Sequence, residues 1–447
     1  MGKGKDNRDG VLFFSPPYAF LGGEELLDPQ NRPPLVSLGA ASVFSYVSAK
    51  AKVPCHFYYS TDYSEGAIKR VLRQYQPRIV AISGFSFNRF ACLAIARIAK
   101  RTDPSVVVVW GGVHATFLDE QLLTHYPYVD LIVRGEGEAT SLELVDAIYQ
   151  GKEADGIAGV SLRFKGKVIR TPSRPRVKNL DEFPLIDYSK VMLKGDFLKA
   201  SSQPFRTALP VEFSRGCPFT CSFCSTVGFW ERQMTYRSVE RVIEQIKLMP
   251  SFPGQGIFFS DTNMTVNPDH FESLCRALIK HKVNIPWFCE TRIDLVDVKA
   301  LRLMKMAGCE LVFFGVESFS KKILLGAGKK FEPYDAVEKI NLAVSLGFKV
   351  RVSLIIGLPG ETHETLAETM RHCQGINSRA NIFTNIAMLY PGSRLYQMAL
   401  KQGFDESYWL KHHKDLCPFY EGALPVHVLR KWEKAFNAYL HTRHKKG

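Results

Sequence analysis

The segment Cys217-Pro218-Phe219-Thr220-Cys221-Ser222-Phe223-Cys224 places three cysteines in eight residues, with the spacing C-x3-C-x2-C. Cysteine thiolates are the ligands of iron–sulfur clusters, and a cubane cluster needs four such ligands. This segment supplies three, so one iron would keep an open coordination position, which is typical of metal sites that bind and activate a ligand. We therefore predict a [4Fe-4S] cluster held by Cys217, Cys221 and Cys224.

Zinc binding and disulfide formation are the alternative uses of these cysteines. A zinc site would need a fourth Cys or His close by, and none lies within a dozen residues on either side. A disulfide would leave the third cysteine over and would need an oxidising compartment. The charged start of the chain, residues 1–6, lacks the apolar core of a signal peptide. We therefore expect a cytoplasmic protein with reduced cysteines.

The composition indicates a globular protein with more than one domain. The chain has 447 residues, of which 46% are apolar, enough for two or three domains with buried cores. No apolar run approaches the ~18–20 residues that span a bilayer. The net charge of +14 favours anionic partners, although a basic protein without such partners would carry the same charge. No RNA-binding signature or zinc finger is present, which argues against a nucleic-acid partner.

Residues 1–150 alternate short apolar runs, which predict strands, with amphipathic segments, which predict helices. The expected strands are 11–14, 53–59, 78–84, 106–110 and 129–134, and the expected helices are 35–49, 64–75, 88–101, 117–125 and 138–149. Such alternation gives a doubly wound parallel sheet. Sheets of this kind bind ligands outside the carboxyl ends of their strands.

Small residues follow the last three of these strands, in the stretches Ser83-Gly84, Gly111-Gly112-Val113-His114 and Gly135-Glu136-Gly137-Glu138. Glycine lets a ligand approach the backbone closely. Ordinary turns between a strand and a helix also contain glycine, so this spacing alone is a weak indication of a ligand site.

The rest of the chain falls into three parts. Residues 151–205 are expected to form a linker with a small hairpin at 156–171. Six strand–helix units are expected at 206–400, with strands at 209–214, 256–260, 285–290, 311–314, 349–356 and 382–389. Residues 401–447 are expected to add helices at 408–413 and 424–444. Their Lys, Arg and His side chains indicate a solvated basic cap, or else a substrate-docking or membrane-surface element.

The cysteine segment follows the first of the six strands, and polar or glycine-bearing stretches follow the other five. These stretches begin at Asp261, Thr291, Gly315, Gly357 and Tyr390. In a parallel barrel, the loops after the strands converge on one face and build the active site. We therefore expect one ligand near the cluster to contact several of them.

The cysteine segment, with Phe223 before its third cysteine, resembles the cluster motif of the radical S-adenosylmethionine (SAM) family. Residues 1–150 resemble the cobalamin (B12)-binding domain of its methyltransferase-type (class B) members. The matching features are Pro16-Pro17, Pro34-Leu35, Gly39, Gly-Gly-x-His at 111–114 and Gly-Glu-Gly-Glu at 135–138. The resemblance implies an α/β chain: a Rossmann-like cobalamin-binding domain (1–150), the linker (151–205), a partial (β/α)6 TIM-type radical SAM barrel (206–400) and a small helical C-terminal extension (401–447).

The resemblance also implies contacts for SAM. Asp261 and Thr262 would meet its amino group, although this stretch departs from the Gly-Gly-Glu form of many relatives. Arg292 would pair with its carboxylate, which suits a guanidinium fork. Glu317 would accept from the ribose hydroxyls, and the stretch that begins at Gly357 would pass under the adenine.

For cobalamin, the implied contacts lie along the carboxyl edge of the first sheet. They are Pro17, Ser83, Phe85, Asn88, Gly111, Gly112, His114, Gly135 and Glu136. The loop from Phe85 to Asn88 is the expected surface under the corrin ring. The Asp-x-His-x-x-Gly motif that supplies a cobalt ligand in other cobalamin domains is absent. We therefore assign no cobalt ligand, and a packed or solvent-bridged His114 is an equal alternative.

The resemblance implies a cobalamin-dependent radical SAM C-methyltransferase. A reduced cluster would cleave SAM to a 5′-deoxyadenosyl radical, this radical would take hydrogen from an unactivated carbon, and cobalamin would deliver the methyl group. Such anaerobic chemistry needs a one-electron reductant of the flavodoxin or ferredoxin type. The sequence leaves the substrate open: a peptide or protein side chain, a natural-product intermediate or a lipid.

Three other functions fit parts of the sequence. A B12-dependent radical SAM cyclase would use the same architecture without methyl transfer. A cobalamin or redox sensor would bind the cofactors without catalysis. A methylthiotransferase acting on tRNA fits less well, because that group carries a further N-terminal cysteine trio, whereas residues 1–150 hold only Cys55 and Cys92.

Overall fold

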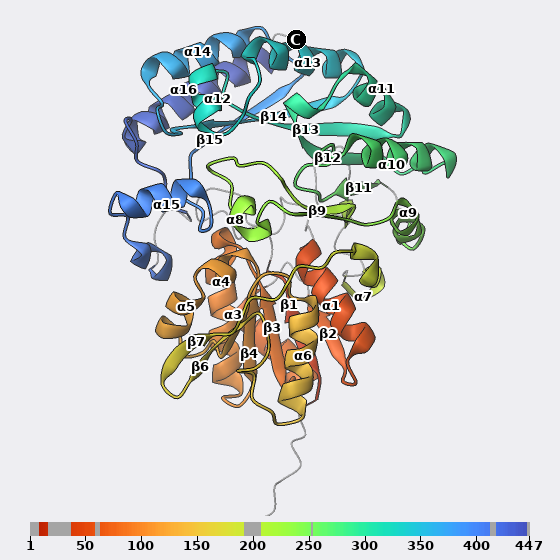
Figure 1. Cartoon of the computed structure of the whole chain (residues 1–447), viewed down its shortest axis with the longest axis vertical. Coiled ribbons are helices and arrows are strands. Elements are labelled where there is room, and N and C mark those ends of the chain that lie inside the picture. The colour runs from red at the N-terminus through yellow and green to blue at the C-terminus, as the bar shows by residue number, and fades with distance from the viewer. Residues whose placement is uncertain are drawn as a thin grey trace, which may run out of the picture. The chain divides into compact units, whose positions relative to one another are not determined.

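The computed structural model describes residues 9–16, 37–58, 63–191, 207–251, 254–411 and 417–444 (Figure 1). Pro17, Pro34-Leu35 and the last two residues of the expected helix at 408–413 lie outside these ranges; its first residues, 408–410, belong to a short 3-10 helix. The chain divides into two compact units. The first unit comprises residues 1–207, 248–254 and 407–416, and the second comprises residues 208–247, 255–406 and 417–447.

The first unit is built on a seven-stranded sheet with the strand order β2-β1-β3-β4-β5-β6-β7. Its strands are β1 (Val11–Phe14), β2 (Cys55–Tyr58), β3 (Ile79–Ser83), β4 (Val107–Gly111), β5 (Leu131–Val133), β6 (Val160–Phe164) and β7 (Lys167–Arg170). The first five are parallel to one another. This confirms the predicted parallel sheet, and its buried β-branched side chains agree with the continuous apolar runs from which it was predicted.

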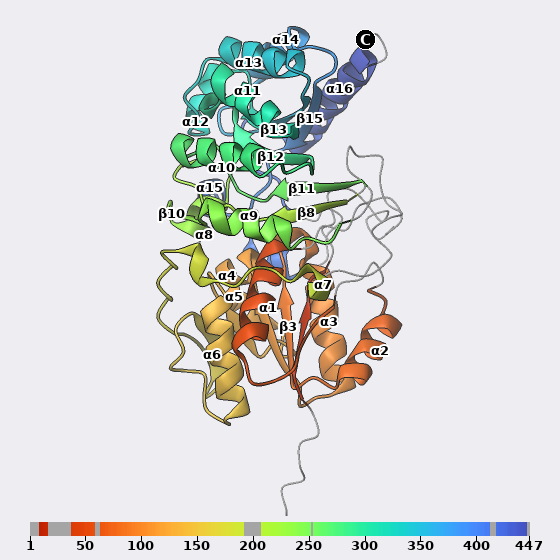
Figure 2. The same ribbon diagram turned by 90° about the vertical axis from the view of Figure 1, so that its right-hand side faces the viewer.

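Helices cover both faces of this sheet. They are α1 (Leu38–Lys50), α2 (Glu65–Tyr75), η3 (Ser86–Asn88), α3 (Arg89–Thr102), α4 (Val113–Phe117), α5 (Asp119–His125), α6 (Glu138–Tyr149), η4 (Leu180–Glu182) and α7 (Tyr188–Val191). Figure 2 shows α1 and α6 on one side of the sheet and α2 and α3 on the other, and the members of each pair contact each other. The side chains of Ser37 and Ser64 cap α1 and α2 at their first turns.

Two local features differ from the prediction. The hairpin expected in the linker joins the sheet, because β6 pairs antiparallel with β5. Its inner side chains, such as Val160 and Leu162, are buried there, and a strand pattern does not reveal which strand it will pair with. The helix expected at 117–125 is two helices, since Leu118 lies between α4 and α5 with φ −120° and ψ 25°.

The second unit is built on a six-stranded sheet with the order β15-β14-β13-β12-β11-β8. The strands are β8 (Thr207–Val211), β11 (Gln255–Phe259), β12 (Trp287–Arg292), β13 (Cys309–Glu317), β14 (Lys349–Ile356) and β15 (Asn381–Ile386). The pairs from β11 to β15 are parallel, as a partial (β/α)6 barrel requires. Two short strands, β9 (Ser214–Gly216) and β10 (Met234–Tyr236), form an antiparallel pair beside it.

Helices of the second unit follow its strands in alternation. They are α8 (Thr226–Trp230), α9 (Val239–Lys247), α10 (Pro268–Lys280), η6 (Ile293–Leu295), α11 (Val298–Met306), α12 (Lys321–Gly326), α13 (Pro333–Ser345), α14 (His363–Gln374), α15 (Arg394–Lys401) and α16 (Val426–His444); η7 (Glu406–Leu410) lies where the chain passes between the units. The C-terminal helix α16 packs along β15. No helix in the described part of the chain is both long and apolar enough to cross a membrane.

Candidate functional site

The cysteine loop lies between β9 and α8 and is fixed by backbone contacts on two sides. The Ser222 N–H donates to the Ala327 carbonyl over 3.1 Å, just after α12 ends. The Ser222 carbonyl accepts from the Leu395 N–H over 2.7 Å, at the start of α15. Gly328 has φ +81°, and a Cβ there would lie 2.9 Å from the Thr220 carbonyl oxygen. The loop is therefore held between the start of α15 and a turn that only glycine fits.

Cations lie beside the three half-buried thiols. Arg292 Nη1 donates to Cys221 Sγ over 3.2 Å, and the Arg292 guanidinium lies 4.1 Å from the centre of the Phe219 ring. Burial raises the pKa of Cys221, whereas the nearby charges of Lys329 and Arg292 lower it. Burial likewise raises the pKa of Cys217 to about 11, although a hydrogen bond from the Phe219 backbone N–H opposes this rise. The cations therefore favour the thiolate form that a metal ligand needs.

The cysteine loop fits an iron–sulfur cluster by its donor set. All three cysteines are free of disulfides and partly accessible. Within the described ranges, no three His, Cys, Asp or Glu side chains already converge as a metal-binding group. The assignment of these three residues to the cluster stays a prediction.

Arg292 and Glu317, the predicted partners of SAM, lie on neighbouring strands. Arg292 Nε and Nη2 bind both carboxylate oxygens of Asp294, over 3.0 and 2.8 Å. Glu317 is buried and has φ +73°, a conformation that side chains rarely adopt and that clusters at functional sites. Ser353 Oγ donates to Glu317 Oε2 over 3.2 Å. Both predicted SAM contacts therefore lie close to the cysteine loop, and both already have polar partners.

Lys329 is a site residue that the sequence analysis missed. Its side chain is 2% exposed, and its Nζ donates to Glu317 Oε1 over 2.9 Å and to the Gly315 carbonyl over 2.7 Å. A lysine is almost never fully buried unless it is paired. No sequence pattern separates it from the adjacent Lys330, which is exposed.

Asp261 and Thr262 follow β11 and differ in exposure. Asp261 is 2% exposed and accepts from Ser214 Oγ over 2.5 Å. Burial raises the pKa of Asp261 to about 7, and Glu212 adds to this rise. In the described part of the chain, Asp261 Oδ2 has no hydrogen-bond partner. Thr262 is exposed. A buried carboxylate oxygen without a partner suits a ligand amino group, which fits the predicted role.

Gly357, the predicted adenine contact, forms a turn that two elements hold in place. It has φ +84°, and a Cβ there would lie 2.5 Å from Leu429 Cδ1 of α16. Its N–H donates to Glu361 Oε2 over 3.3 Å. Burial raises the pKa of Glu361 to about 7. The positive φ favours glycine at this turn, and the Leu429 side chain of α16 packs against it.

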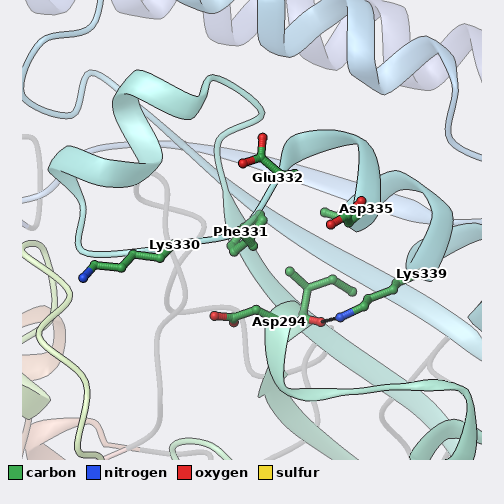
Figure 3. Close-up of a pocket in the computed structure, with 8 residues that line it drawn as sticks. Asp294, Lys330, Phe331, Glu332, Asp335 and Lys339 are labelled. Carbon is green, nitrogen blue, oxygen red and sulfur yellow. Dashed lines mark hydrogen bonds between the residues drawn. The ribbon is translucent and has the colours of Figure 1, made fainter.

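A cavity of about 290 Å³ lies between η6 and the start of α13 (Figure 3). It is lined by Ile293, Asp294, Lys330, Phe331, Glu332, Asp335, Ala336 and Lys339. None of the predicted SAM residues lines it. Its link to the cysteine loop is Asp294, which pairs with Arg292.

In the first unit, the structure brings together several of the predicted cobalamin contacts. Ser83 pairs with Gly111 across the carboxyl ends of β3 and β4. Gly112 has φ +100°, and a Cβ there would lie 2.5 Å from the Gly84 carbonyl oxygen. Asn88 Oδ1 accepts from the Phe85 N–H over 2.7 Å. These turns pack so closely that they leave room only for glycine at Gly112.

The other cobalamin predictions lie along the same edge, after β4 and β5. The Gly135 N–H donates to Thr116 Oγ1 over 3.1 Å, and Glu136 Oε2 accepts from the Val177 N–H over 3.0 Å. These contacts order the turn after β5. The carboxyl edge that binds ligands in such sheets therefore carries all of the predicted residues that the structure describes.

His114 packs inside the first unit. Its side chain is 0% exposed, and its Nδ1 lies 3.0 Å from Ser86 Oγ. Its ring contacts Trp110 and Trp409, with centroids 5.8 and 5.5 Å away. Burial lowers the pKa of His114 to about 3, so the imidazole is neutral at ordinary pH. This geometry supports the packed alternative, and no observation supports contact of His114 with a corrinoid.

Two domains, one with a three-cysteine loop on a half-barrel and one with a glycine-lined parallel sheet, define a class of enzymes that use SAM and cobalamin together. Residues 211–373 match the model of the Radical SAM superfamily, and residues 35–145 match that of the B12 binding domain. The chain belongs to the B12-binding members of the radical SAM superfamily.

Relatives with this domain pair include methyltransferases and cyclases. Over 364 residues, the chain is 34% identical to an uncharacterized methyltransferase of Pyrococcus horikoshii, covering 81% of this chain and 78% of the relative. Over 402 residues, it is 31% identical to the anaerobic magnesium-protoporphyrin IX monomethyl ester cyclase of Rubrivivax gelatinosus. This match covers 87% of this chain and 69% of the cyclase. The solved radical SAM methyltransferase TsrM of Kitasatospora setae shares the fold, with a TM-score of 0.73 at 16% identity over 96% of this chain and 89% of that one.

These matches confirm the family, the α/β fold class and the expectation of an enzyme. They also confirm the three cofactors of the class: a [4Fe-4S] cluster, SAM and cobalamin. The individual residues that would bind them stay predictions.

Proposed function

We propose that this chain is a cobalamin-dependent radical SAM C-methyltransferase that acts on an unactivated carbon. The observation that carries the proposal is the cysteine loop, held beside two buried cations, Arg292 and Lys329, in a chain that also has a B12-binding domain. The 34% identity to a methyltransferase over most of both chains supports methyl transfer. We propose a cytoplasmic location and a flavodoxin- or ferredoxin-type reductant, as the sequence predicts.

When bound, the cluster and SAM supply one-electron cleavage of a carbon–sulfur bond, and cobalamin supplies a methyl carrier. The chain's own residues bind and orient these groups. Cys217, Cys221 and Cys224 hold the cluster, and Arg292 donates a hydrogen bond to one of these sulfurs. Lys329 and Ser353 hold the Glu317 carboxylate in one orientation through its two oxygens, and this carboxylate would contact SAM.

The decisive experiment uses anaerobically purified, reconstituted protein with cobalamin, a chemical reductant and SAM that carries a deuterated methyl group. We expect an iron-dependent visible spectrum and formation of 5′-deoxyadenosine. With an accepted substrate, the product should carry a CD3 group in place of one hydrogen. Cys224→Ser should abolish 5′-deoxyadenosine formation. Cys55→Ser, which changes a half-buried cysteine outside the loop, should leave it intact.

Ring formation without methyl transfer is the second candidate, and the 31% identity to the Rubrivivax cyclase favours it. Product mass separates the two, because a cyclase product gains no carbon. Reconstituted protein that binds both cofactors but makes no 5′-deoxyadenosine would instead be a sensor, and both enzyme proposals would fail.

A further inference from the structure

The strands of the second unit present two different faces. Side chains of one face pack under the helices: Trp287, Cys289, Val312, Phe314, Val350 and Val352 are at most 2% exposed. Trp287 Nε1 donates to the Ala307 carbonyl at the end of α11. Figure 1 shows α11, α13 and α14 along this side of β13 and β14. We call the opposite side the inner face, and it comprises Glu290, Phe313, Arg351, Asn381 and Phe383.

The inner face leads to the cysteine loop. Side chains two residues apart on a strand lie on the same side of a sheet. Arg292, which contacts Cys221, follows Glu290 by two residues. Ser353, which donates to Glu317, follows Arg351 by two residues. The inner face therefore lies directly beneath the residues that surround the cysteine loop.

Charged and aromatic side chains alternate across this face. Glu290 pairs in register with Phe313, Phe313 with Arg351, and Arg351 with Asn381. Neighbouring strands lie ~4.8 Å apart, so the backbones of Glu290 and Arg351 are about 10 Å apart. An acid and a base therefore stand on either side of an aromatic ring.

The aromatic rings of the inner face are ordered and accessible. Phe383, on the edge strand β15, is 36% exposed. Its ring lies nearly parallel to that of Phe313, at an angle of 11° with centroids 6.4 Å apart. The Arg351 guanidinium lies 5.6 Å from the Phe383 ring centre. A closed barrel core would be filled by branched aliphatic side chains instead.

Glu290 is the acidic side chain of this face. It is solvent-exposed, and desolvation raises the pKa of its carboxyl to about 7, with a further contribution from the charge of Glu317. Among the described residues, Glu290 makes no ion pair.

We propose that the inner face binds the substrate, an amphipathic organic anion. Arg351 binds its carboxylate or phosphate, Phe313 and Phe383 contact its flat apolar part, and Glu290 accepts a hydrogen bond from a donor group on it. The inference rests on the proposed function, which requires a substrate next to the cysteine loop, and it names the substrate class. A neutral hydrocarbon lipid fits less well, because it offers no polar group to the charged side chains of this face.

The test measures binding of three matched probes to the full-length protein: 2-naphthoate, 2-naphthyl phosphate and the neutral 2-naphthamide. We expect at least one of the two anions to bind at least tenfold more tightly than the amide, and the stronger anion identifies the carboxylate or phosphate source. Arg351→Gln should remove this preference, and Arg351→Lys should keep part of it. Arg276→Gln, which removes the same charge from the exposed side of α10, should change nothing.

Glu290→Gln should tighten binding of the anions severalfold, because it removes a like charge from the face. Failure of the wild-type protein to bind any probe, or an anion preference that survives in Arg351→Gln, would overturn the inference. Circular dichroism of each variant shows whether it has folded. If Arg351→Gln does not fold, the anion preference is measured with Arg351→Lys instead. Probe binding needs no turnover, so the two proposals can fail separately. If the protein prefers anions but makes no 5′-deoxyadenosine, the proposed function is refuted and the inference about the inner face remains. If it makes 5′-deoxyadenosine but shows no anion preference, the inference about the inner face is refuted and the proposed function remains.

Discussion

Arg292 Nη1 donates a hydrogen bond to Cys221 Sγ over 3.2 Å, while Nε and Nη2 of the same guanidinium bind Asp294. One side chain thus links the middle cysteine of the loop to the carboxyl end of β12. The ion pair with Asp294 raises the pKa of Arg292, so its charge is permanent. Hydrogen bonds to sulfur and nearby charge are two of the factors that set the reduction potential of an iron–sulfur cluster.

Arg292→Gln should lower the midpoint potential of the reconstituted cluster. A hydrogen bond from a charged group contributes ~1.5–3 kcal/mol, which corresponds to a shift of up to about 65–130 mV for one electron. The measurement is a redox titration followed by electron paramagnetic resonance. Arg276→Gln is the control for loss of charge. An unchanged potential in Arg292→Gln would show that this hydrogen bond is absent once the cluster is bound.

Lys329→Met should destabilise the second unit, because it leaves the buried Glu317 carboxylate without its cation. Breaking a buried ion pair typically costs about 3–5 kcal/mol, whereas replacing both partners by apolar residues is often neutral. The double variant Lys329→Met/Glu317→Met should therefore recover much of the loss. Lys330→Met, at the adjacent exposed position, should stay within ~0.5 kcal/mol of the parent. Guanidinium unfolding curves measure all three, and equal effects of Lys329→Met and Lys330→Met would contradict the pairing.

Gly112→Ala should weaken cobalamin binding. Its φ of +100° and the Gly84 carbonyl 2.5 Å from an added Cβ oppose any side chain. We expect a cost of at least about 1–3 kcal/mol and a distorted turn at the edge that carries the predicted cobalamin contacts. Titration of hydroxocobalamin, followed by its visible spectrum, gives the affinity. Gly66→Ala, on an open position of α2, should keep full affinity. Equal affinities in the two variants would separate this turn from cobalamin binding.

Periodicity and motif spacing predicted the elements of both sheets because these signals are local. The buried strands β3 and β4 appear in the sequence as apolar runs, and the cysteine loop as a fixed spacing. The surroundings of individual side chains were harder to predict, because they depend on residues far away in the chain. His114 is buried against Trp409, almost three hundred residues later, and no local pattern indicates that contact.

The candidate site shows the same division. The family resemblance implied Arg292 and Glu317 as SAM contacts, but no sequence pattern indicated that Asp294 and Lys329 are already their partners. Lys329 and Lys330 are adjacent and chemically identical, and only the turn after α12 decides which is buried. The inner face depends on the register between β12, β13 and β14, which aligns Glu290, Phe313 and Arg351.

Glu361 should make the stability of the second unit depend on pH. Burial raises the pKa of Glu361 from 4.5 to about 7, although hydrogen bonds from Thr365 and Gly357 oppose the rise. Between these two values the folded state binds more protons than the unfolded state, so stability is full below about 4.5 and falls as pH rises through 7. A shift of this size corresponds to on the order of 3 kcal/mol.

Glu361→Gln should therefore flatten the decline of stability between pH 5 and pH 7.5, measured by urea unfolding of the protein without cofactors. Asp261 and Glu290 also have raised pKa values, so part of the decline should remain. Glu364→Gln is the matched control, because the pKa of Glu364 is lowered, mainly by its hydrogen bond with Thr362, and it stays ionised over this range. A decline as steep in Glu361→Gln as in Glu364→Gln would show that Glu361 is ionised in the folded chain. The Gly357 N–H would then donate to an ionised Glu361 carboxylate over the whole pH range tested.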